Sequence, residues 1–377
     1  MSHEVLGCIA YVIVFGLATT LVYFGEKKKW KWLVVLGLAL PILVAAFRGI
    51  NVGTDTRAYA DMYEQVTTEG WQKTFDERLL NREIEPFIVF ISKLGGFLGF
   101  GRWWTFGIFS AITVIFTYLA ITKVYYKNKW LLYGLFLFMV FPNSLNVMRQ
   151  MAAMSILLYL LVIIFNMINE RKKVSCKKII GLALFAIILH YGSILVLPVF
   201  GLLLLYKKLG FKKVVSLVIL LLTFLIPFLV NINLIVSKFG LLSEKHTDGL
   251  LGFQGRIFNF NFWIFCVIIF GLIIGFLKYK KQTLKKATII FEIKILLMII
   301  GTFYASIGFF SGYIGRLADF FWPVAIYISV LEITKYIKNR RMREIALLTS
   351  GVAYFIVTFA IVGINKIMPY TLIEGIF

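Results

Sequence analysis

The sequence predicts an all-α, polytopic integral membrane protein with about twelve membrane-crossing helical arms. Hydrophobic residues make up 60% of its 377 residues and charged residues only 15%, whereas about a quarter of the residues in soluble domains are charged. Apolar runs of about 20 residues, the length that a helix needs to cross the hydrocarbon core, recur along the chain. This composition excludes a soluble enzyme. It also excludes the nucleic-acid-binding domain that a net charge of +22 would otherwise suggest.

Ten of the expected arms are apolar runs of roughly spanning length. The first run has no basic segment before it and no small-residue cleavage site after it, so we expect it to be retained as a helix. The runs start near residues 5, 32, 103, 130, 150, 214, 257, 295, 317 and 345.

Residues 179–206 predict two further, shorter arms. Lysine pairs at 177–178 and 207–208 flank the segment, and His190 interrupts its middle. If the lysines mark one side of the membrane, the segment must enter and return. We therefore expect two short or broken helices, with His190 near the turn and below the membrane surface.

The basic residues predict the topology. Six short loops contain 26 of the 40 Lys and Arg residues. Because loops rich in Lys and Arg stay in the cytoplasm, we place all six there, which puts both termini outside. The net charge then needs no anionic partner. The six loops are 26–31, 123–129, 171–178, 207–213, 278–286 and 335–343.

Residues 86–100 are the exception among the apolar runs. They number only 15, and they include Lys93 and three glycines, so we expect an interfacial or re-entrant helix on the outer face. The whole chain, 1–377, then forms one membrane-embedded domain with two sizeable outer loops, 48–85 and 233–256. Eight of the 18 acidic residues fall in the first loop.

Five arginines remain near the predicted outer surface. Arginine binds phosphate through a planar fork of donors and keeps its charge. Arg149, between two apolar runs, is either an interfacial residue that reaches the head groups or a ligand for an anionic head group. Arg316 either pairs with Asp319 one helical turn later or binds a ligand. The set is Arg48, Arg57, Arg149, Arg256 (after a glycine-spaced loop) and Arg316.

Acidic residues and one histidine are candidates for proton transfer. Asp55, in the turn "VGTDT", is either a general base or the cap of the next helix. Glu83 and Glu85 are alternatives for the same role. His190 is either a satisfied residue at a helix tip or a group that binds substrate or moves a proton.

Motifs for cofactors are missing from the sequence. The three histidines and three cysteines are scattered, which predicts no metal site. We find no Walker A loop, HExxH or DxD motif. We therefore expect no cofactor, and a substrate that arrives already activated.

Five motifs, taken in order, resemble the EpsG-like group of Wzy-type polysaccharide polymerases of bacteria. The resemblance implies a helical fold similar to the GT-C class and a metal-independent glycosyltransferase at the outer face of the cytoplasmic membrane. Such an enzyme joins undecaprenyl-pyrophosphate-linked oligosaccharides to a growing exopolysaccharide or capsule chain, and a flippase and a chain-length regulator are implied partners. The motifs are "FRGINVGTDTRAY" (47–59), "EPFIVFISKLG" (85–95), "MRQMAAMSILL" (148–158), "LHYGSILVLP" (189–198) and "GRLADFF" (315–321).

The resemblance also implies roles for individual residues. Arginines at the head-group boundary would stabilise the charge that develops on the departing pyrophosphate, and a carboxylate or histidine would take the acceptor proton. Arg57 and Arg256 come from the arginine pattern alone. The expected catalytic residues are Asp55, Glu85 and His190, and the expected substrate-binding residues are Arg48, Arg57, Tyr59, Arg149, Gln150, Arg256 and Arg316.

Three other functions remain open at this point. A flippase or transporter of a lipid-linked oligosaccharide would also need arginines for the pyrophosphate, but it would be expected to show internal symmetry and paired charges in mid-membrane. A glycan ligase would use the same donor chemistry as a polymerase. An acyltransferase would need a donor path from the cytoplasm, which an outer histidine fits poorly.

Overall fold

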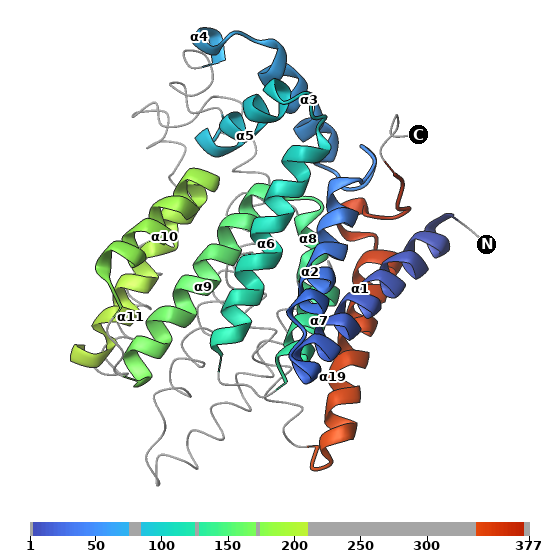
Figure 1. Ribbon diagram of the computed structural model, residues 1–377, viewed down its shortest axis with the longest axis vertical. Helices are drawn as coiled ribbons and strands as arrows, with labels where there is room; N and C mark the ends of the chain where they lie inside the picture. Colours follow the sequence, from blue (N-terminus) through green and yellow to red (C-terminus); the bar gives the residue numbers. More distant parts are fainter. Residues whose placement is uncertain (1–2, 75–83, 125–127, 171–173, 210–336, 373–377) are drawn as a thin grey trace, which may run out of the picture. The chain divides into compact units, whose positions relative to one another are not determined.

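The computed structural model describes residues 3–74, 84–124, 128–170, 174–209 and 337–372 (Figure 1). These residues are largely helical, with one isolated antiparallel β-bridge between Arg48 and Leu372, in agreement with the expected all-α class. The chain divides into two compact units. Unit 1 comprises Met1–Ile163, Val174–Ser193 and Glu344–Phe377, and unit 2 comprises Ile164–Lys173 and Ile194–Arg343.

Four helical segments among the described residues are long and apolar enough to cross a membrane. They are His3–Lys28, Trp103–Lys123, Met148–Ile168 and Arg340–Ile361. These helices make the chain a membrane protein. The count of twelve arms stays a prediction, because the runs expected near residues 214, 257, 295 and 317 lie outside the described residues, as does the outer loop 233–256.

The packed helices of unit 1 begin with the N-terminal hairpin. α1 packs against α2 and α7, and α2 packs in turn against α6 (Figure 1). The bounds are α1 His3–Lys28, α2 Lys31–Ala46, α6 Trp103–Lys123 and α7 Lys129–Met139.

The run expected from residue 130 is shorter in the structure than the sequence suggested. α7 ends at Met139, and a separate turn, α8 (Phe141–Ser144), follows it. Pro142 explains the break, since proline has no backbone N–H and disfavours helical geometry in the residue before it. The 11 residues of α7 correspond to about 17 Å of helix. The α7 helix therefore ends before the polar sequence around Asn146.

Glycines allow α1 and α2 to pack closely. A Cβ added at Gly37 of α2 would lie 2.8 Å from the Ala18 carbonyl oxygen and 2.8 Å from a methyl group of Val22, both on α1. The Tyr133 hydroxyl of α7 donates a hydrogen bond to the Gly37 carbonyl oxygen at 3.0 Å. Small residues at such contacts are the usual means by which membrane helices approach one another.

Short helices follow the first long hairpin. α5 packs on α3, α6 and α10, and its 12 residues give about 18 Å of helix. A short helix was expected here, and its depth in the membrane stays a prediction. The bounds are α3 Thr56–Thr68, α4 Trp71–Lys73, α5 Pro86–Phe97, α9 Met148–Glu170, α10 Cys176–Leu189 and η2 Tyr191–Leu195.

The expected break at His190 is present. α10 ends at Leu189, His190 has an extended backbone (φ −158°, ψ 116°), and the short turn η2 follows. In unit 2, α11 (Leu197–Leu209) is the helix that comes next along the chain. Two short helices with His190 between them are thus present as expected, and their entry into and return from the membrane stays a prediction.

The C-terminal part of the chain returns to the loop that follows α2. It consists of α19 (Arg340–Phe355), the π-helical turn η4 (Ile356–Ile361) and the turn η5 (Ile364–Lys366), followed by an extended stretch to Leu372. The backbone N–H of Gly49 donates to the Thr371 carbonyl oxygen at 2.7 Å. The two segments therefore lie side by side although more than 300 residues of chain separate them.

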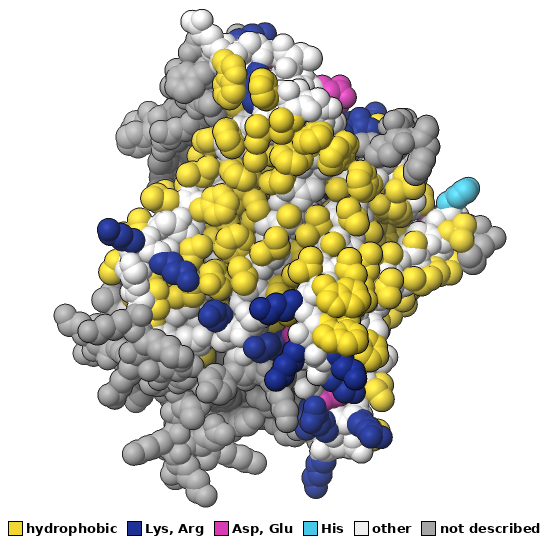
Figure 2. All heavy atoms as spheres, in the orientation of Figure 1, with side chains coloured by type: hydrophobic (Ala, Val, Ile, Leu, Met, Phe, Trp, Pro, Cys, Tyr) yellow, Lys and Arg dark blue, Asp and Glu magenta, His cyan; other side chains and the backbone are white. Residues whose placement is uncertain are grey.

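The face shown in Figure 2 is a broad expanse of hydrophobic side chains, with most of the visible Lys and Arg side chains in the lower half of the view and a few at its top. α1 and α2 contribute exposed apolar residues such as Ile13, Leu17 and Val35. Such a surface would be unfavourable in water. It matches the apolar exterior that a bilayer requires.

Candidate functional site

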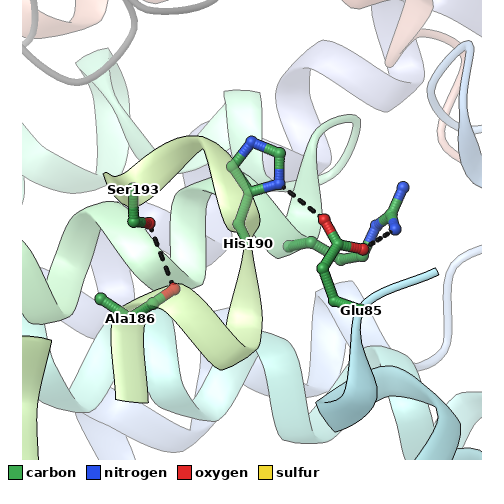
Figure 3. A network of polar contacts seen from close by, with 5 residues as sticks. Glu85, Ala186, His190 and Ser193 are labelled. Carbon is green, nitrogen blue, oxygen red and sulfur yellow. Dashed lines mark hydrogen bonds and ion pairs between the residues drawn. The ribbon is translucent and has the colours of Figure 1, made fainter. Parts of the chain in front are cut away.

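Four side chains from four separate segments of unit 1 meet at helix ends. Tyr59 comes from α3, Glu85 directly precedes α5, Arg149 is the second residue of α9 and His190 ends α10. All four were expected site residues. Figure 3 shows the polar contacts around Glu85 and His190.

Glu85 is the shared partner in this cluster. It is 5% exposed and has the extended backbone (φ −71°, ψ 144°) that a following proline favours. Its side chain makes no capping hydrogen bond to α5. One carboxylate oxygen accepts a hydrogen bond from Nη1 of Arg149, and the other lies 2.9 Å from Nδ1 of His190 (Figure 3).

The charge on Glu85 follows from these neighbours. Burial by itself raises the pKa of the Glu85 carboxyl, but the positive charge of Arg149 and the hydrogen bond from His190 lower it by more, so the net shift is downward. Glu85 is therefore ionised at neutral pH. An ionised carboxylate with a lowered pKa is a weak base, which suits a group that orients its neighbours.

Arg149 keeps donors available for a ligand. Its guanidinium lies over the ring of Tyr59, with 5.3 Å between Cζ and the ring centroid, an attractive arrangement for a cation. The side chain is 21% exposed. Nε has no hydrogen-bond partner within the part of the chain that the structure describes. A buried donor in this state points to a water molecule or an anion as its missing partner.

His190 is held by the backbone that follows it. The N–H of Ser193 donates to the His190 carbonyl oxygen at 3.0 Å, and the Ser193 hydroxyl donates to the Ala186 carbonyl oxygen at 3.1 Å (Figure 3). Because the ionised Glu85 carboxylate can only accept, Nδ1 of His190 carries the proton. Nε2 is then the nitrogen that can accept a proton.

Gly192 leaves space beside that nitrogen. A Cβ added at Gly192 would lie 2.8 Å from Nε2 and 3.2 Å from Cδ2 of His190. Carbon atoms do not approach so closely, so any other residue here would displace the imidazole. Lack of space for a side chain beside the His190 ring thus explains the glycine in "LHYGS", which the sequence did not reveal.

Asp55 lies at the edge of the cluster. It occupies the N-cap position of α3, but its side chain makes no capping hydrogen bond. One carboxylate oxygen lies 3.2 Å from the Thr54 hydroxyl, and Tyr59 is one helical turn further along the same face. The Asp55 side chain therefore does not cap α3 in this structure, and its role as a general base stays a prediction.

Arg48 is buried in the protein, with 1% of its surface exposed, and its expected position near the outer membrane surface stays a prediction. Nη1 donates to the Ala45 carbonyl oxygen at 2.5 Å, and Nε donates to the Thr56 hydroxyl at 3.3 Å. The guanidinium also lies 4.2 Å from the ring centroid of Phe106. The carboxyl-terminal carbonyls of α2 and the aromatic face take up its charge, while burial lowers the pKa of Arg48 to about 10.

The other expected binding residues have different surroundings. Arg57 is exposed and donates to the side-chain oxygen of Asn51 at 3.2 Å, while Gln150 is buried beside Arg149 in α9. Arg256 and Arg316 lie outside the described residues. In the described ranges, no group of three or more His, Cys, Asp or Glu residues could hold a metal ion.

Sequence reasoning missed a set of asparagines behind the cluster. Asn146, three residues before Arg149, accepts hydrogen bonds from the Asp55 N–H and the Thr54 hydroxyl, each at 2.8 Å. Asn365 is a further member, from the C-terminal end of the chain. The available signal was the polar stretch "PNSLN" (142–146) between two apolar runs.

Comparison with known proteins gives one match. The model of a family described as the EpsG family matches residues 30–372. This range includes all four residues of the cluster and the three asparagines Asn143, Asn146 and Asn365. No curated protein and no solved structure matches the chain.

Proposed function

The chain belongs to the EpsG family, and from this premise we propose that it polymerises lipid-linked oligosaccharides. The family consists of glycosyltransferase-like, polysaccharide-polymerase-type membrane proteins. The proposed reaction joins undecaprenyl-pyrophosphate-linked repeat units at the outer face of the bacterial cytoplasmic membrane, without a metal ion. The observation that carries the proposal is the contact of Arg149, Glu85 and His190 beside Tyr59.

Arg149 is the proposed ligand of the donor pyrophosphate. Glu85 engages one guanidinium nitrogen, which orients the group without using all of its five N–H donors. A preorganised cation stabilises the charge that develops on the leaving pyrophosphate more than it stabilises the intact donor. The further proposed substrate contacts are Arg57, Gln150, Arg256 and Arg316. Arg48 is buried, so its proposed contribution is the positive charge that it holds in the protein interior.

His190 is the proposed general base, with Asp55 as the alternative. The acceptor hydroxyl oxygen attacks the anomeric carbon of the donor sugar, and its proton passes to Nε2 of His190 as the carbon–oxygen bond to pyrophosphate breaks. The bonding electrons leave with the pyrophosphate. Glu85 holds Nδ1–H and stabilises the imidazolium that forms, as the carboxylate does in other carboxylate–histidine pairs.

The setting of this reaction is proposed with it. Both termini would lie outside, the growing polysaccharide would be the second substrate, and a flippase and a chain-length regulator would be partners. The flippase would supply the lipid-linked unit on the outer face. No nucleotide would be needed, because the pyrophosphate linkage already activates the sugar.

The test is chain growth by the purified protein in liposomes that contain the host's undecaprenyl-pyrophosphate-linked repeat unit. We expect a ladder of products that Arg149→Ala and His190→Gln each reduce roughly a hundredfold or more. Arg341→Ala, which removes an exposed arginine at the beginning of α19, is the matched control and should retain the ladder.

Two results would contradict the proposal. A ladder that persists in Arg149→Ala would remove the pyrophosphate site from this cluster. Absence of any ladder from the unmodified protein, together with movement of the lipid-linked unit across the bilayer, would instead establish a flippase.

A further inference from the structure

The last described residues of the chain bind the loop that carries Asp55. We call residues 363–372 the C-terminal clasp. The N–H of Gly53 donates to the Lys366 carbonyl oxygen at 3.0 Å, and the N–H of Thr54 donates to the Asn365 carbonyl oxygen at 3.1 Å. Together with the bond from Gly49 to Thr371, these contacts give the loop backbone three partners from the clasp.

Asn365 also joins the clasp to the turn before α9. Its side-chain Nδ2 donates to Oδ1 of Asn143 at 2.8 Å, and its Oδ1 accepts from Nδ2 of Asn146 at 3.2 Å. Asn146 in turn accepts the Asp55 N–H. A continuous chain of hydrogen bonds therefore runs from Asn365 through Asn146 to the backbone of Asp55.

The clasp is firmly anchored. Ile367 is fully buried, and the Tyr370 hydroxyl donates to the Val44 carbonyl oxygen of α2 at 3.0 Å. Asn365 has a positive φ of 64°, a conformation that asparagine and glycine adopt more readily than other residues. Both the side chain and the backbone at position 365 thus favour asparagine.

The hydrogen-bonded residues lie close in sequence to the site residues. Asn146 is three residues before Arg149, and Asp55 is four residues before Tyr59. A shift of Asn146 would be transmitted to the first turns of both α9 and α3. Displacements of about 1 Å at a reacting group can lower rates by two orders of magnitude.

We propose that Asn365 is a positioning residue of the active site, acting through Asn146 on the backbone of Asp55 and on the first turns of α3 and α9. This proposal rests on the polymerase function proposed above. The C-terminal clasp would then be required for chain growth although none of its residues contacts the cluster of Arg149, Glu85 and His190 through a hydrogen bond that the structure describes. Truncation after Val362 should abolish growth, whereas a chain that ends at Leu372 keeps every described contact.

Two substitutions at position 365 separate the amide from the backbone. Asn365→Gly keeps the positive φ without strain and removes the bridge to Asn146, so we expect chain growth to fall roughly tenfold or more. Asn365→Asp keeps an acceptor for Asn146. Asn143 can then turn its amide to donate to the new carboxylate, because its Nδ2 has no hydrogen-bond partner among the described residues. We expect the aspartate variant to stay within a few-fold of the unmodified protein.

A combined variant tests the route through Asn146. Asn146→Ala should itself lower chain growth, because it removes the acceptor of the Asp55 N–H, and adding Asn365→Gly should then lower it by a much smaller factor than in the unmodified background. Equal losses in both backgrounds, or an aspartate variant as poor as the glycine variant, would show a general structural role and overturn the proposal.

A measurement without substrate distinguishes this proposal from the proposed function. Hydrogen–deuterium exchange of the purified protein should show faster exchange at the N–H groups of Gly53, Thr54 and Asp55 in Asn365→Gly than in the unmodified protein. Unchanged protection would overturn the positioning role even if polymer forms. Faster exchange in a protein that forms no polymer would support the role of the C-terminal clasp in holding the loop and would contradict the proposed polymerase function.

Discussion

At the scale of single residues, the site depends on Glu85 having two partners at once. Its carboxylate orients the Arg149 guanidinium and sets which nitrogen of His190 carries the proton. A buried carboxylate would be costly alone, and it is stable here because both neighbours favour its charged form. One acidic residue therefore organises the proposed anion ligand and the proposed base.

Substitution of Gly192 should impair His190 without disturbing the helix before it. In Gly192→Ala, the new methyl group would lie 2.8 Å from Nε2, so the imidazole must shift, and its hydrogen bond to Glu85 should weaken. We expect chain growth to fall roughly ten- to a hundredfold, with little change in the thermal midpoint of the purified protein.

Gly181 supplies the matched control for this substitution. It lies in α10, and no atom lies within 4 Å of a Cβ added there. Gly181→Ala should retain chain growth, because it adds the same methyl group in open space. Full activity of Gly192→Ala would show that the His190 ring can adapt and would argue against its role as the base.

At the scale of secondary structure elements, the site is built from helix ends. Glu85 precedes α5, Arg149 begins α9 and His190 follows α10. Backbone groups at helix ends lack partners within the helix, and the polar residues needed there can face a substrate. α2 packs against α6, α6 packs against α5, and α5 packs against α3 and α10, so the long helices support these ends through α6.

The contact between α1 and α2 is a test of that support. Gly37→Ala would place a methyl group 2.8 Å from the backbone of α1, and overpacking of this kind costs about 1–3 kcal/mol. We expect a lower thermal midpoint in detergent, measured by the loss of monomer on heating and size-exclusion chromatography.

Gly16→Ala is the control within the same hairpin. No atom lies within 4 Å of a Cβ at Gly16 of α1, and alanine favours a helix over glycine by about 1 kcal/mol. This variant should match or exceed the unmodified protein in stability. Equal thermal midpoints for Gly37→Ala and Gly16→Ala would mean that α1 and α2 can accommodate the added methyl group at little cost in stability.

At the scale of the whole molecule, the distribution of charge predicts the orientation in the membrane. The basic turn at 26–31 joins α1 to α2 and the basic turn at 123–129 joins α6 to α7, whereas the loop with Asp55 and Glu85 follows the other end of α2. Loops rich in Lys and Arg remain in the cytoplasm. The site should therefore face outward, where the proposed lipid-linked sugars and polymer would meet.

Cysteine labelling tests this orientation. In a variant without the native cysteines, Asp61→Cys should react with a membrane-impermeant maleimide added to intact cells, and Lys28→Cys should react only after the cells are opened. Both positions are exposed. The reverse pattern would place the site in the cytoplasm and exclude chain growth on the outer face.

The sequence by itself determined the class of the protein, because apolar length and the placement of lysines report directly on the membrane. It also led us to expect Tyr59, Glu85, Arg149 and His190 in one site, through motifs that keep their order, and the structure brings these four side chains together. It did not show that Glu85 joins Arg149 to His190, nor that Arg48 is buried at the end of α2.

The tertiary structure decided these points because they depend on contacts between distant segments. Nothing in the local pattern of residues 363–372 indicates that the C-terminal clasp binds residues 49–54, and the reason for Gly192 exists only where the His190 ring packs against it. Hydropathy is a property of each segment alone. Hydrogen bonds between asparagines from different segments, and the space around an imidazole, arise only when the helices pack.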